Sequence, residues 1–292
     1  MCDIIGPVEI PGTHIAHTLE QLLKKEVKKL KRKPKLTVFL VGKTKDQISF
    51  VKIKAKTARR VGVRFELIHL KSIPSFEEFM HKIKEKSLDV ETTGIIIQQP
   101  LPAQLSTESL YDYIPTVKEI EGHKHKTTYL PPIGLATLTI LKYIFGQGKI
   151  DHNLIIDLKR DNSFFRKTFR NKRVVVVGRG FTGGKPIGKT LSDAKINYIN
   201  INSQTPEPES YFKEADIIIT AVGKKILDPQ WLKPGVVLIN VGLRHERGKL
   251  RGDFEEKEVK NIASFYTPTP GGAGPIDVVY LFRNLVEAAK SQ

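Results

Sequence analysis

Short apolar runs alternate with longer amphipathic segments along most of the chain, which predicts parallel strands connected by helices. The runs contain few polar positions, as is typical of strands that are buried on both faces of a sheet. The chain is therefore predicted to have an α/β fold. Strands are expected over residues 36–41, 64–70, 94–98, 174–177, 196–201, 215–223 and 236–242, and helices over 49–61, 76–86, 133–145, 187–194 and 276–289.

A lysine-rich segment near the N-terminus is also predicted to be a helix, because Ile15, Leu19 and Leu23 recur there at helical spacing. Thr13 is the expected N-cap of this helix, and the lysines are expected on its solvent face. Residues 146–171 carry many charges without a clear period, so an extended segment between regular elements is expected there.

The composition is that of a globular protein, with 292 residues, 40% apolar and 27% charged. This length favours about two domains. The net charge of +17 fits nucleic acid, an anionic membrane or anionic small molecules as partners. No signature of a nucleic-acid-binding module accompanies the charge, so a nucleic-acid ligand is disfavoured.

The sequence also bears on compartment and metal binding. No apolar run is long enough to span a membrane, and the first residues do not resemble a signal peptide. A single cysteine, Cys2, suits the cytosol, and a cytoplasmic protein is expected. Sites with several thiolate ligands are excluded, and His123 and His125 are interpreted as loop residues, so no metal is expected.

The strongest functional signal is a glycine-rich loop that follows the valine strand 174–177. Gly178, Gly180 and Gly183 have the G-x-G-x-x-G spacing, and Gly184 leads into the next helix. Glycine at these positions lets backbone N–H groups approach a pyrophosphate and lets the helix pack close to the strand. An ordinary glycine-rich loop is the alternative, but the strand–loop–helix context favours a dinucleotide site.

The residues after the next strand bear on the choice of dinucleotide. An NAD site usually has an Asp or Glu about twenty residues past the loop, and no acid ends the strand 196–201. Ser203 and the cation of Arg179 can instead accept a 2′-phosphate, which favours NADP, with NAD as the alternative. Arg179 can also be interpreted as a solvated loop residue.

Several motifs, in this order along nearly the whole chain, resemble the methylenetetrahydrofolate dehydrogenase/cyclohydrolase family. Each motif alone is weak, but their joint order is specific. The closest matches are Gln98-Gln-Pro-Leu-Pro102, Gly178-Arg179 with Gly184-x-Pro186, Val241-Gly242, Gly252-Asp253-Phe254 and Pro270-Gly-Gly-Ala-Gly-Pro275.

The resemblance implies a particular domain organisation. An N-terminal three-layer α/β domain over residues 1–145, completed by the C-terminal helix 276–292, would bind folate and carry catalysis. A C-terminal Rossmann domain over 146–275 would bind NADP, and two helices would join the domains. A homodimer formed through the Rossmann domain is also implied.

Members of this family oxidise 5,10-methylenetetrahydrofolate by hydride transfer to NADP, and most then hydrolyse the methenyl product to 10-formyltetrahydrofolate. The resemblance implies that Lys54, one helical turn after Phe50, transfers the proton in hydrolysis and that Gln98 holds its amine. A lysine can do this near neutral pH if desolvation or a neighbouring cation lowers its pKa. Glu121 would bind the amino-pyrimidine edge of the pterin. A surface lysine is the alternative interpretation of Lys54.

The resemblance implies further binding residues for both molecules. They are Pro270, Gly271, Gly272 and Asp277, with Phe50, for the folate, and Gly178, Arg179, Gly180, Gly183, Gly184, Ser203, Val222, Gly223 and Leu243 for the cofactor.

The sequence departs from the family pattern at several site positions. Phe50 keeps a ring but lacks the family's tyrosine hydroxyl, Glu121 is one methylene longer than the usual Asp, and Gly180 replaces a Ser. Asn240 and Asp277 stand where Asp and Thr are usual. Two alternatives follow: a dehydrogenase for this or a related reduced pterin that has lost hydrolysis, and, from another class, a basic nucleic-acid-binding protein on the same scaffold.

Overall fold

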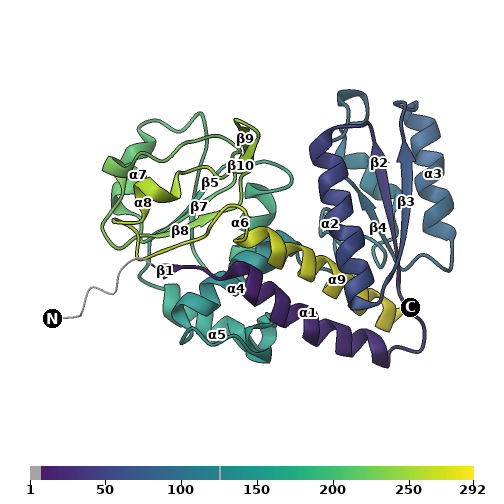
Figure 1. The fold of residues 1–292 in the computed structure, drawn as a ribbon, viewed down its shortest axis with the longest axis horizontal. Helices are drawn as coiled ribbons and strands as arrows, with labels where there is room; N and C mark the ends of the chain where they lie inside the picture. Colours follow the sequence, from purple (N-terminus) through teal and green to yellow (C-terminus); the bar gives the residue numbers. More distant parts are fainter. Residues whose placement is uncertain (1–7, 125) are drawn as a thin grey trace. The chain divides into compact units, whose positions relative to one another are not determined.

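The computed structural model describes residues 8–124 and 126–292, so Cys2 and His125 lie outside the described residues. The chain divides into two compact units (Figure 1). One contains the chain up to Leu19 and Ile133–Asp277; the other contains Glu20–Pro132 and Val278–Gln292. The domain limits expected from the sequence, 145 and 275, differ from these and remain a prediction.

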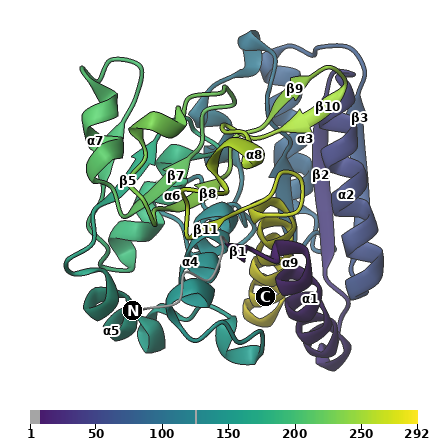
Figure 2. The same ribbon diagram turned by 60° about the vertical axis from the view of Figure 1, so that its left-hand side comes forward.

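The second unit, here called the three-stranded unit, is built on a parallel sheet in the order β3-β2-β4 (Figure 1 and Figure 2). Every residue of β4 and all but the first of β2 are buried, so both faces of the sheet are covered at these two strands, whereas no residue of β3 is buried. Phe39 and Phe79 meet edge to face in its core, with ring centroids 5.7 Å apart. The elements are β2 Lys35–Val41, α2 Lys45–Val61, β3 Arg64–Leu70, α3 Phe76–Leu88 and β4 Gly94–Ile97.

The starts of α2 and of the N-terminal helix differ from the sequence prediction. Helix α2 begins at Lys45 instead of residue 49, because the Thr44 hydroxyl caps it by accepting a hydrogen bond from the Gln47 N–H at 3.3 Å. Helix α1, Gly12–Lys29, begins one residue before Thr13, so Thr13 is not its N-cap. The Thr13 hydroxyl instead donates to the Gly271 carbonyl at 3.4 Å.

The first unit, here called the six-stranded unit, contains a parallel sheet in the order β1-β11-β8-β7-β5-β6. All residues of β5, β7 and β8 are buried. Strand β5 pairs with β6 on one side and with β7 on the other, so the winding of the chain reverses beside β5. The elements are β1 Val8–Glu9, α4 Pro132–Phe145, α5 Leu158–Phe169, β5 Val174–Val177, α6 Gly184–Asp193, β6 Ile199–Ile201, α7 Pro208–Glu214, β7 Ile217–Thr220, β8 Val237–Asn240, α8 Glu256–Val259 and β11 Phe265–Tyr266. Helix α9, Ala273–Ser291, belongs to this unit up to Asp277 and to the three-stranded unit from Val278 on.

The prediction of an extended segment over 146–171 was wrong in its second half, because Leu158–Phe169 form helix α5. The Asp157 carboxylate caps this helix by accepting a hydrogen bond from a first-turn N–H. Phe165 is fully buried, and Asp161, 4% exposed, pairs with Lys142 on α4 at 2.8 Å. Most charged residues of α5 therefore lie on its solvent side, whereas Asp161 forms a buried ion pair.

A β-hairpin was missed and the last helix was predicted too short. Strands β9, Arg244–Glu246, and β10, Lys249–Arg251, pair antiparallel. Arg247 and Gly248 join them with φ angles of 49° and 73°, as a two-residue type I′ turn requires. Helix α9 begins at Ala273, before the predicted start at residue 276. Within residues 8–124 and 126–292, no helix has the length and apolar character needed to cross a membrane.

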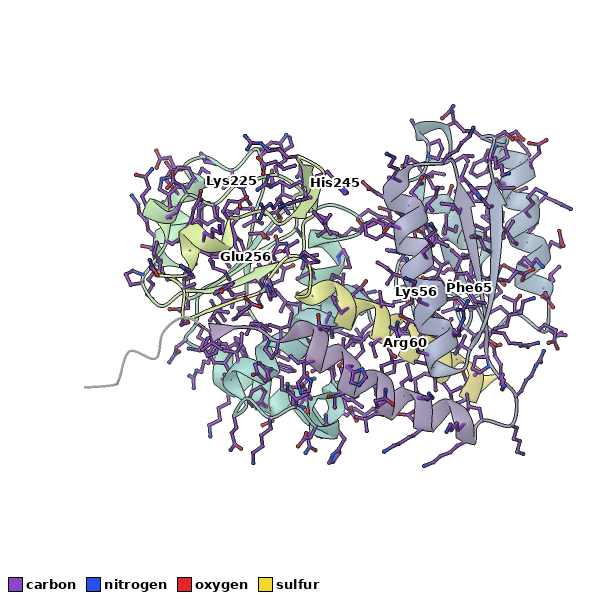
Figure 3. All side chains as sticks on the ribbon, in the orientation of Figure 1. Lys56, Arg60, Phe65, Lys225, His245 and Glu256 are labelled. Atoms are coloured by element: carbon purple, nitrogen blue, oxygen red, sulfur yellow. The ribbon has the colours of Figure 1, made fainter. Side chains whose placement is uncertain are left out.

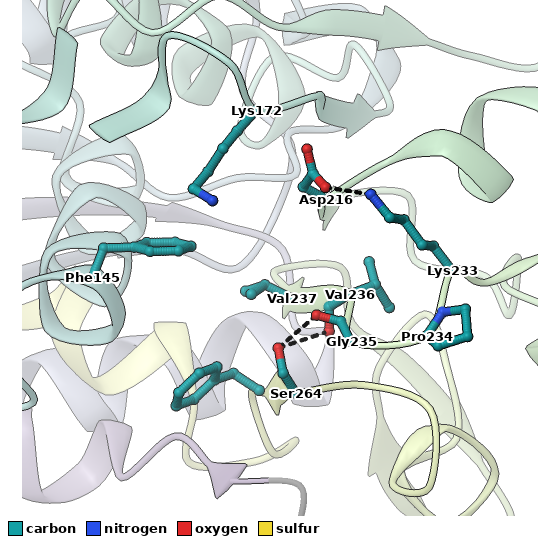
Figure 4. A pocket seen from close by; sticks show the side chains of 10 residues that line it. Phe145, Lys172, Asp216, Lys233, Pro234, Gly235, Val236, Val237 and Ser264 are labelled. Atoms are coloured by element: carbon teal, nitrogen blue, oxygen red, sulfur yellow. Dashed lines mark hydrogen bonds and ion pairs between the residues drawn. The ribbon is translucent and has the colours of Figure 1, made fainter. Parts of the chain in front are cut away.

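A pocket of about 180 Å³ opens at the amino edge of the six-stranded sheet (Figure 4). Lys233 donates to Asp216 at 2.6 Å, and the Lys172 ammonium lies 4.9 Å from the Phe145 ring centroid. Burial opposes ionisation of Asp216, but the bonds from Lys233 and a backbone N–H outweigh it and hold its pKa below the usual value. Asp216 directly precedes β7, so this pocket lies at the opposite edge of the sheet from the glycine loop.

In the three-stranded unit, Asp89 connects the end of α3 to β2. Its carboxylate accepts hydrogen bonds from the Glu91 N–H at 2.8 Å, the Thr92 hydroxyl at 2.9 Å and the Lys35 ammonium at 3.3 Å. The Glu91 N–H, helped by Thr92 and Lys35 and opposed by burial, lowers the pKa of Asp89 to about 2.

We therefore expect Asp89→Asn to lower the free energy of unfolding by about 1 kcal/mol at pH 7, after allowance for the partial exposure of the pair. The pKa of the folded state lies below the ordinary value of 3.8, so the contribution is present above that value and is lost as the pH falls through about 2. Urea unfolding at pH 7 and near pH 2 measures it, with the exposed Asp112→Asn as control. A difference from the parent that does not shrink at low pH would contradict the assignment.

Candidate functional site

The glycine loop lies at the carboxyl end of β5, where backbones meet at distances that only glycine allows. Gly178 has a φ of 106°, and its N–H donates to the Ile201 carbonyl at 2.8 Å. A Cβ on Gly178 would stand 2.6 Å from the Ala221 carbonyl at the end of β7. A Cβ on Gly184 would stand 2.0 Å from the Gly178 carbonyl. Strand β5, strand β7 and helix α6 therefore converge on this loop.

Helix α6 begins at Gly184, three residues before the predicted start, and Gly183 is its N-cap. No described side chain caps it there. The first turn of a helix presents N–H groups and a partial positive charge, which together favour a bound phosphate. The loop and the helix start thus fit the pyrophosphate of a dinucleotide.

Arg179 lies beside the turn that follows β6. Its Nη2 donates to the Gln204 Oε1 at 2.9 Å, and Ser203 is the neighbouring residue in that turn. All three residues are exposed. The structure therefore places Arg179 beside the turn that carries Ser203.

The segment after β7 forms a second wall of this edge and is held by Asp253. The fully buried Asp253 carboxylate accepts hydrogen bonds from the N–H groups of Val222, Gly223 and Lys224 at 2.9, 2.8 and 3.1 Å. Burial raises the pKa of Asp253, although these bonds oppose the shift. Val222 and Leu243 are 39% and 41% exposed, so both present apolar surface. The role of Asp253 was missed, although its Gly-Asp-Phe motif was noted in the sequence.

Asn240 joins this wall to the segment that leads to Pro270. Its Oδ1 accepts from the Thr220 hydroxyl at 3.0 Å and the Asp253 N–H at 2.8 Å. Its Nδ2 donates to the Gly242 carbonyl at 2.8 Å and the Thr269 hydroxyl at 2.9 Å. An ionised aspartate could not donate either of the last two bonds, so the amide suits this buried position.

The segment 267–275 packs on the start of α1 through backbone contact. Thr269–Pro270 is a cis peptide, and Gly271 has a φ of 111°. A Cβ on Gly12 would stand 2.2 Å from the Gly272 carbonyl. Asp277 follows on α9 and is half-buried. The six-stranded unit thus holds four of the residues that the sequence assigned to the folate.

In the three-stranded unit, Lys54 and Gln98 are in direct contact. Lys54 Nζ donates to Gln98 Oε1 at 2.7 Å, and Gln98 is 6% exposed. Phe50 lies one turn earlier on α2 and is half-buried. Gln47, 2% exposed, ties the start of α2 to the segment after β4, because its Nε2 donates to the Pro100 carbonyl at 2.6 Å. Gln47 was missed; the signal for it is the Thr-x-x-Gln spacing that begins at Thr44.

Glu121 is placed by a buried neighbour, Glu119, which sequence reasoning also missed. Glu119 is 1% exposed and accepts hydrogen bonds from the N–H groups of Glu121 at 2.9 Å and His123 at 3.1 Å. Gly122 between them has a φ of 75°. The Glu121 side chain stays 18% exposed, with Oε2 4.0 Å from His123 Nε2. Among the described residues, no group of three His, Cys, Asp or Glu side chains could hold a metal ion.

A parallel sheet with a glycine loop at the strand where its winding reverses, followed by a helix whose N-cap is a glycine, defines a dinucleotide-binding Rossmann protein. The family follows from comparison with known proteins. The model of the catalytic domain of tetrahydrofolate dehydrogenase/cyclohydrolase matches residues 10–121, and that of its NAD(P)-binding domain matches residues 160–292. The chain belongs to this family, which confirms the resemblance and the fold class expected from the sequence.

Individual relatives agree over almost the full length. A bifunctional protein FolD from Geobacillus thermodenitrificans is 36% identical over 286 residues, with 96% of each chain covered. The structure of FolD from Campylobacter jejuni is similar with a TM-score of 0.84 at 26% identity, covering 97% of this chain and 99% of that one. A FolD structure from Trypanosoma brucei, complexed with NADP and an inhibitor, has a TM-score of 0.83 at 23% identity, with 98% of each chain covered, and supports the fold.

Substitution of Gly184 by alanine is expected to weaken NADP binding, whereas alanine at a glycine with open space around it is not. Gly184→Ala would force a Cβ against the Gly178 carbonyl, so we expect NADP affinity to fall about 10-fold or more through displacement of the helix start. Gly274→Ala, in the first turn of α9, is the control, since no described atom outside its chain neighbours and its own helix backbone lies within 4 Å of its Cβ position, and it should bind NADP within about twofold of the parent. Fluorescence titration with NADP and a thermal melt of each variant measure this. Parental affinity in Gly184→Ala would refute the close-packing argument.

Proposed function

We propose that this protein oxidises 5,10-methylenetetrahydrofolate with NADP and hydrolyses the methenyl product to 10-formyltetrahydrofolate. The observation that carries the proposal is the 2.7 Å hydrogen bond between Lys54 and Gln98. It occurs in a chain that family models of both the catalytic and the NAD(P)-binding domain match. The relatives named bifunctional protein FolD support both activities.

The hydride step needs alignment more than acid–base chemistry. Bound NADP supplies the hydride acceptor. The glycine loop and the start of α6 hold its pyrophosphate, and Arg179 and Ser203 bind its 2′-phosphate. The exposed apolar side chains of Val222 and Leu243 border its rings beside Gly223. The loop residues assigned to NADP are Gly178, Gly180, Gly183 and Gly184.

The hydrolytic step needs a group that accepts a proton from the attacking water and returns one to the departing ring nitrogen. Lys54 performs this transfer, and Gln98 fixes the direction of its amine by accepting a hydrogen bond from it. Phe50 stacks on the aminobenzoate, and Glu121 binds the amino-pyrimidine edge of the pterin. Further folate contacts are assigned to Pro270, Gly271, Gly272 and Asp277.

A dehydrogenase without hydrolysis is the second candidate function. Phe50 carries no hydroxyl, and the Glu121 carboxylate stands on a side chain one methylene longer than aspartate. Phe50 and Glu121 are both assigned to the folate, whereas the glycines assigned to NADP are kept. A protein that lost hydrolysis but retained the hydride transfer would show these differences.

We also propose a cytoplasmic homodimer. Strand β6 is the last strand in the order of the six-stranded sheet, and Ile199 on it is 43% exposed, which supports a partner at this edge. A single cysteine in 292 residues supports a reducing compartment. The proposed functional division remains residues 1–145 with 276–292 for folate, and 146–275 for NADP.

Lys54→Met tests the assignment of the proton-transfer residue. We expect its rate of methenyltetrahydrofolate hydrolysis to fall by about 10²-fold or more, because no other assigned group moves the proton, while NADP affinity stays unchanged. Lys56→Met is the matched control on the same helix, where the exposed Lys56 is labelled in Figure 3. Hydrolysis by Lys54→Met at the parental rate would show that another residue acts as the base.

A further inference from the structure

Hydrogen bonds through Gln98 and through the backbone and side chain of Gln99 lead from Lys54 into the three-stranded unit. Lys54 donates to Gln98, and Gln98 Nε2 in turn donates to the Gln99 carbonyl at 2.7 Å. Gln99 Nε2 donates to the Tyr111 hydroxyl at 3.1 Å. Tyr111 lies in the 3₁₀ helix Glu108–Tyr113 and is 3% exposed. The path therefore reaches a buried phenol that the proposed chemistry does not use.

The Tyr111 ring also lies against the ring of His123, which faces the Glu121 carboxylate. The rings of Tyr111 and His123 are 4.9 Å apart between centroids and inclined at 60°. The His123 side chain is 9% exposed, and its Nε2 lies 4.0 Å from Glu121 Oε2. Burial, and then the charge of Glu121, raise the pKa of Tyr111, so the phenol keeps its proton. Tyr111 and His123 thus form a buried aromatic wall behind the Glu121 carboxylate.

A glutamate side chain needs more packing contacts than an aspartate side chain to keep its carboxylate in one orientation. It has one more rotatable bond, so its carboxylate must be held by packing if it is to meet a ligand in one orientation. The N–H groups bound by Glu119 fix the backbone at residues 121–123, but not the Glu121 side chain. Side-chain contacts must supply the remaining restraint, and one of them is with His123, whose Nε2 lies 4.0 Å from Glu121 Oε2.

We propose that Tyr111 and His123 are positioning residues for Glu121, which hold its carboxylate in the orientation that binds the amino-pyrimidine edge of the folate. Through Gln99, Tyr111 also couples this end of the site to the Gln98–Lys54 pair. The proposal rests on the folate function proposed above and concerns residues that the function itself does not assign.

The test is the steady-state kinetics of His123→Phe and Tyr111→Phe in the full-length protein. His123→Phe keeps an aromatic ring without the nitrogen that faces Glu121, and Tyr111→Phe keeps its ring without the hydroxyl. Because Glu121 contacts bound folate before and during reaction, the KM for methylenetetrahydrofolate should rise about fivefold or more in each. The kcat and the KM for NADP should stay within about twofold of the parent. His81→Phe, an exposed histidine on α3, is the matched control and should change neither constant.

A double-mutant cycle separates positioning from general stabilisation. The Glu121→Asp variant carries its carboxylate on a shorter side chain, which needs less restraint. In this background, His123→Phe should therefore raise the folate KM by less than about twofold. Equal effects of His123→Phe in both backgrounds, or an unchanged folate KM in both single variants, would overturn the positioning role while leaving the proposed function intact. A parent that forms no methenyltetrahydrofolate with NADP or NAD would overturn both. Tyr111→Phe keeps the test decisive if His123→Phe does not fold.

Discussion

Close backbone contact at the carboxyl ends of β5 and β7 is the constraint on which the dinucleotide edge depends. The Gly178 and Gly184 backbones approach so closely that a Cβ on Gly184 would overlap the Gly178 carbonyl at 2.0 Å. Only this approach lets α6 start at the sheet edge and direct its N–H groups at a phosphate. The parallel sheet creates the edge, since its buried valine and isoleucine strands fix where β5 and β7 end.

Buried polar groups determine the conformation of the assigned segments within each unit. In the six-stranded unit, Asp253 gathers three backbone N–H groups, and Asn240 satisfies both its oxygen and its nitrogen between Thr220, Asp253, Gly242 and Thr269. In the three-stranded unit, Gln47 hydrogen-bonds the segment that carries Gln98, and Glu119 hydrogen-bonds the segment that carries Glu121. Buried groups of this kind are costly if left unpaired, so each of them specifies one loop conformation.

The sequence allowed prediction of features that are encoded locally. Val174–Val177 and the glycines after it specify a strand, a turn and a helix within a few residues, and the structure has all three. Helix α5 escaped prediction because its buried face is narrow and includes the ion-paired Asp161 among many exposed charges. Asp253 and Gln47 act on partners about thirty and fifty residues away, a relation that periodicity and spacing do not reveal. Lys54, Gln98 and Glu121 were found through family motifs, because a lysine-rich helix by itself does not distinguish Lys54 from Lys56.

The central claim is that this protein both oxidises methylenetetrahydrofolate and hydrolyses the product. The most direct measurement mixes purified protein, methylenetetrahydrofolate and NADP and follows the methenyl absorbance over time, with NAD in parallel. We expect a rise with NADP followed by a decay that scales with enzyme concentration and exceeds the spontaneous rate. A rise without that decay would contradict the hydrolytic assignment of Lys54, and no rise with either dinucleotide would contradict both proposed activities.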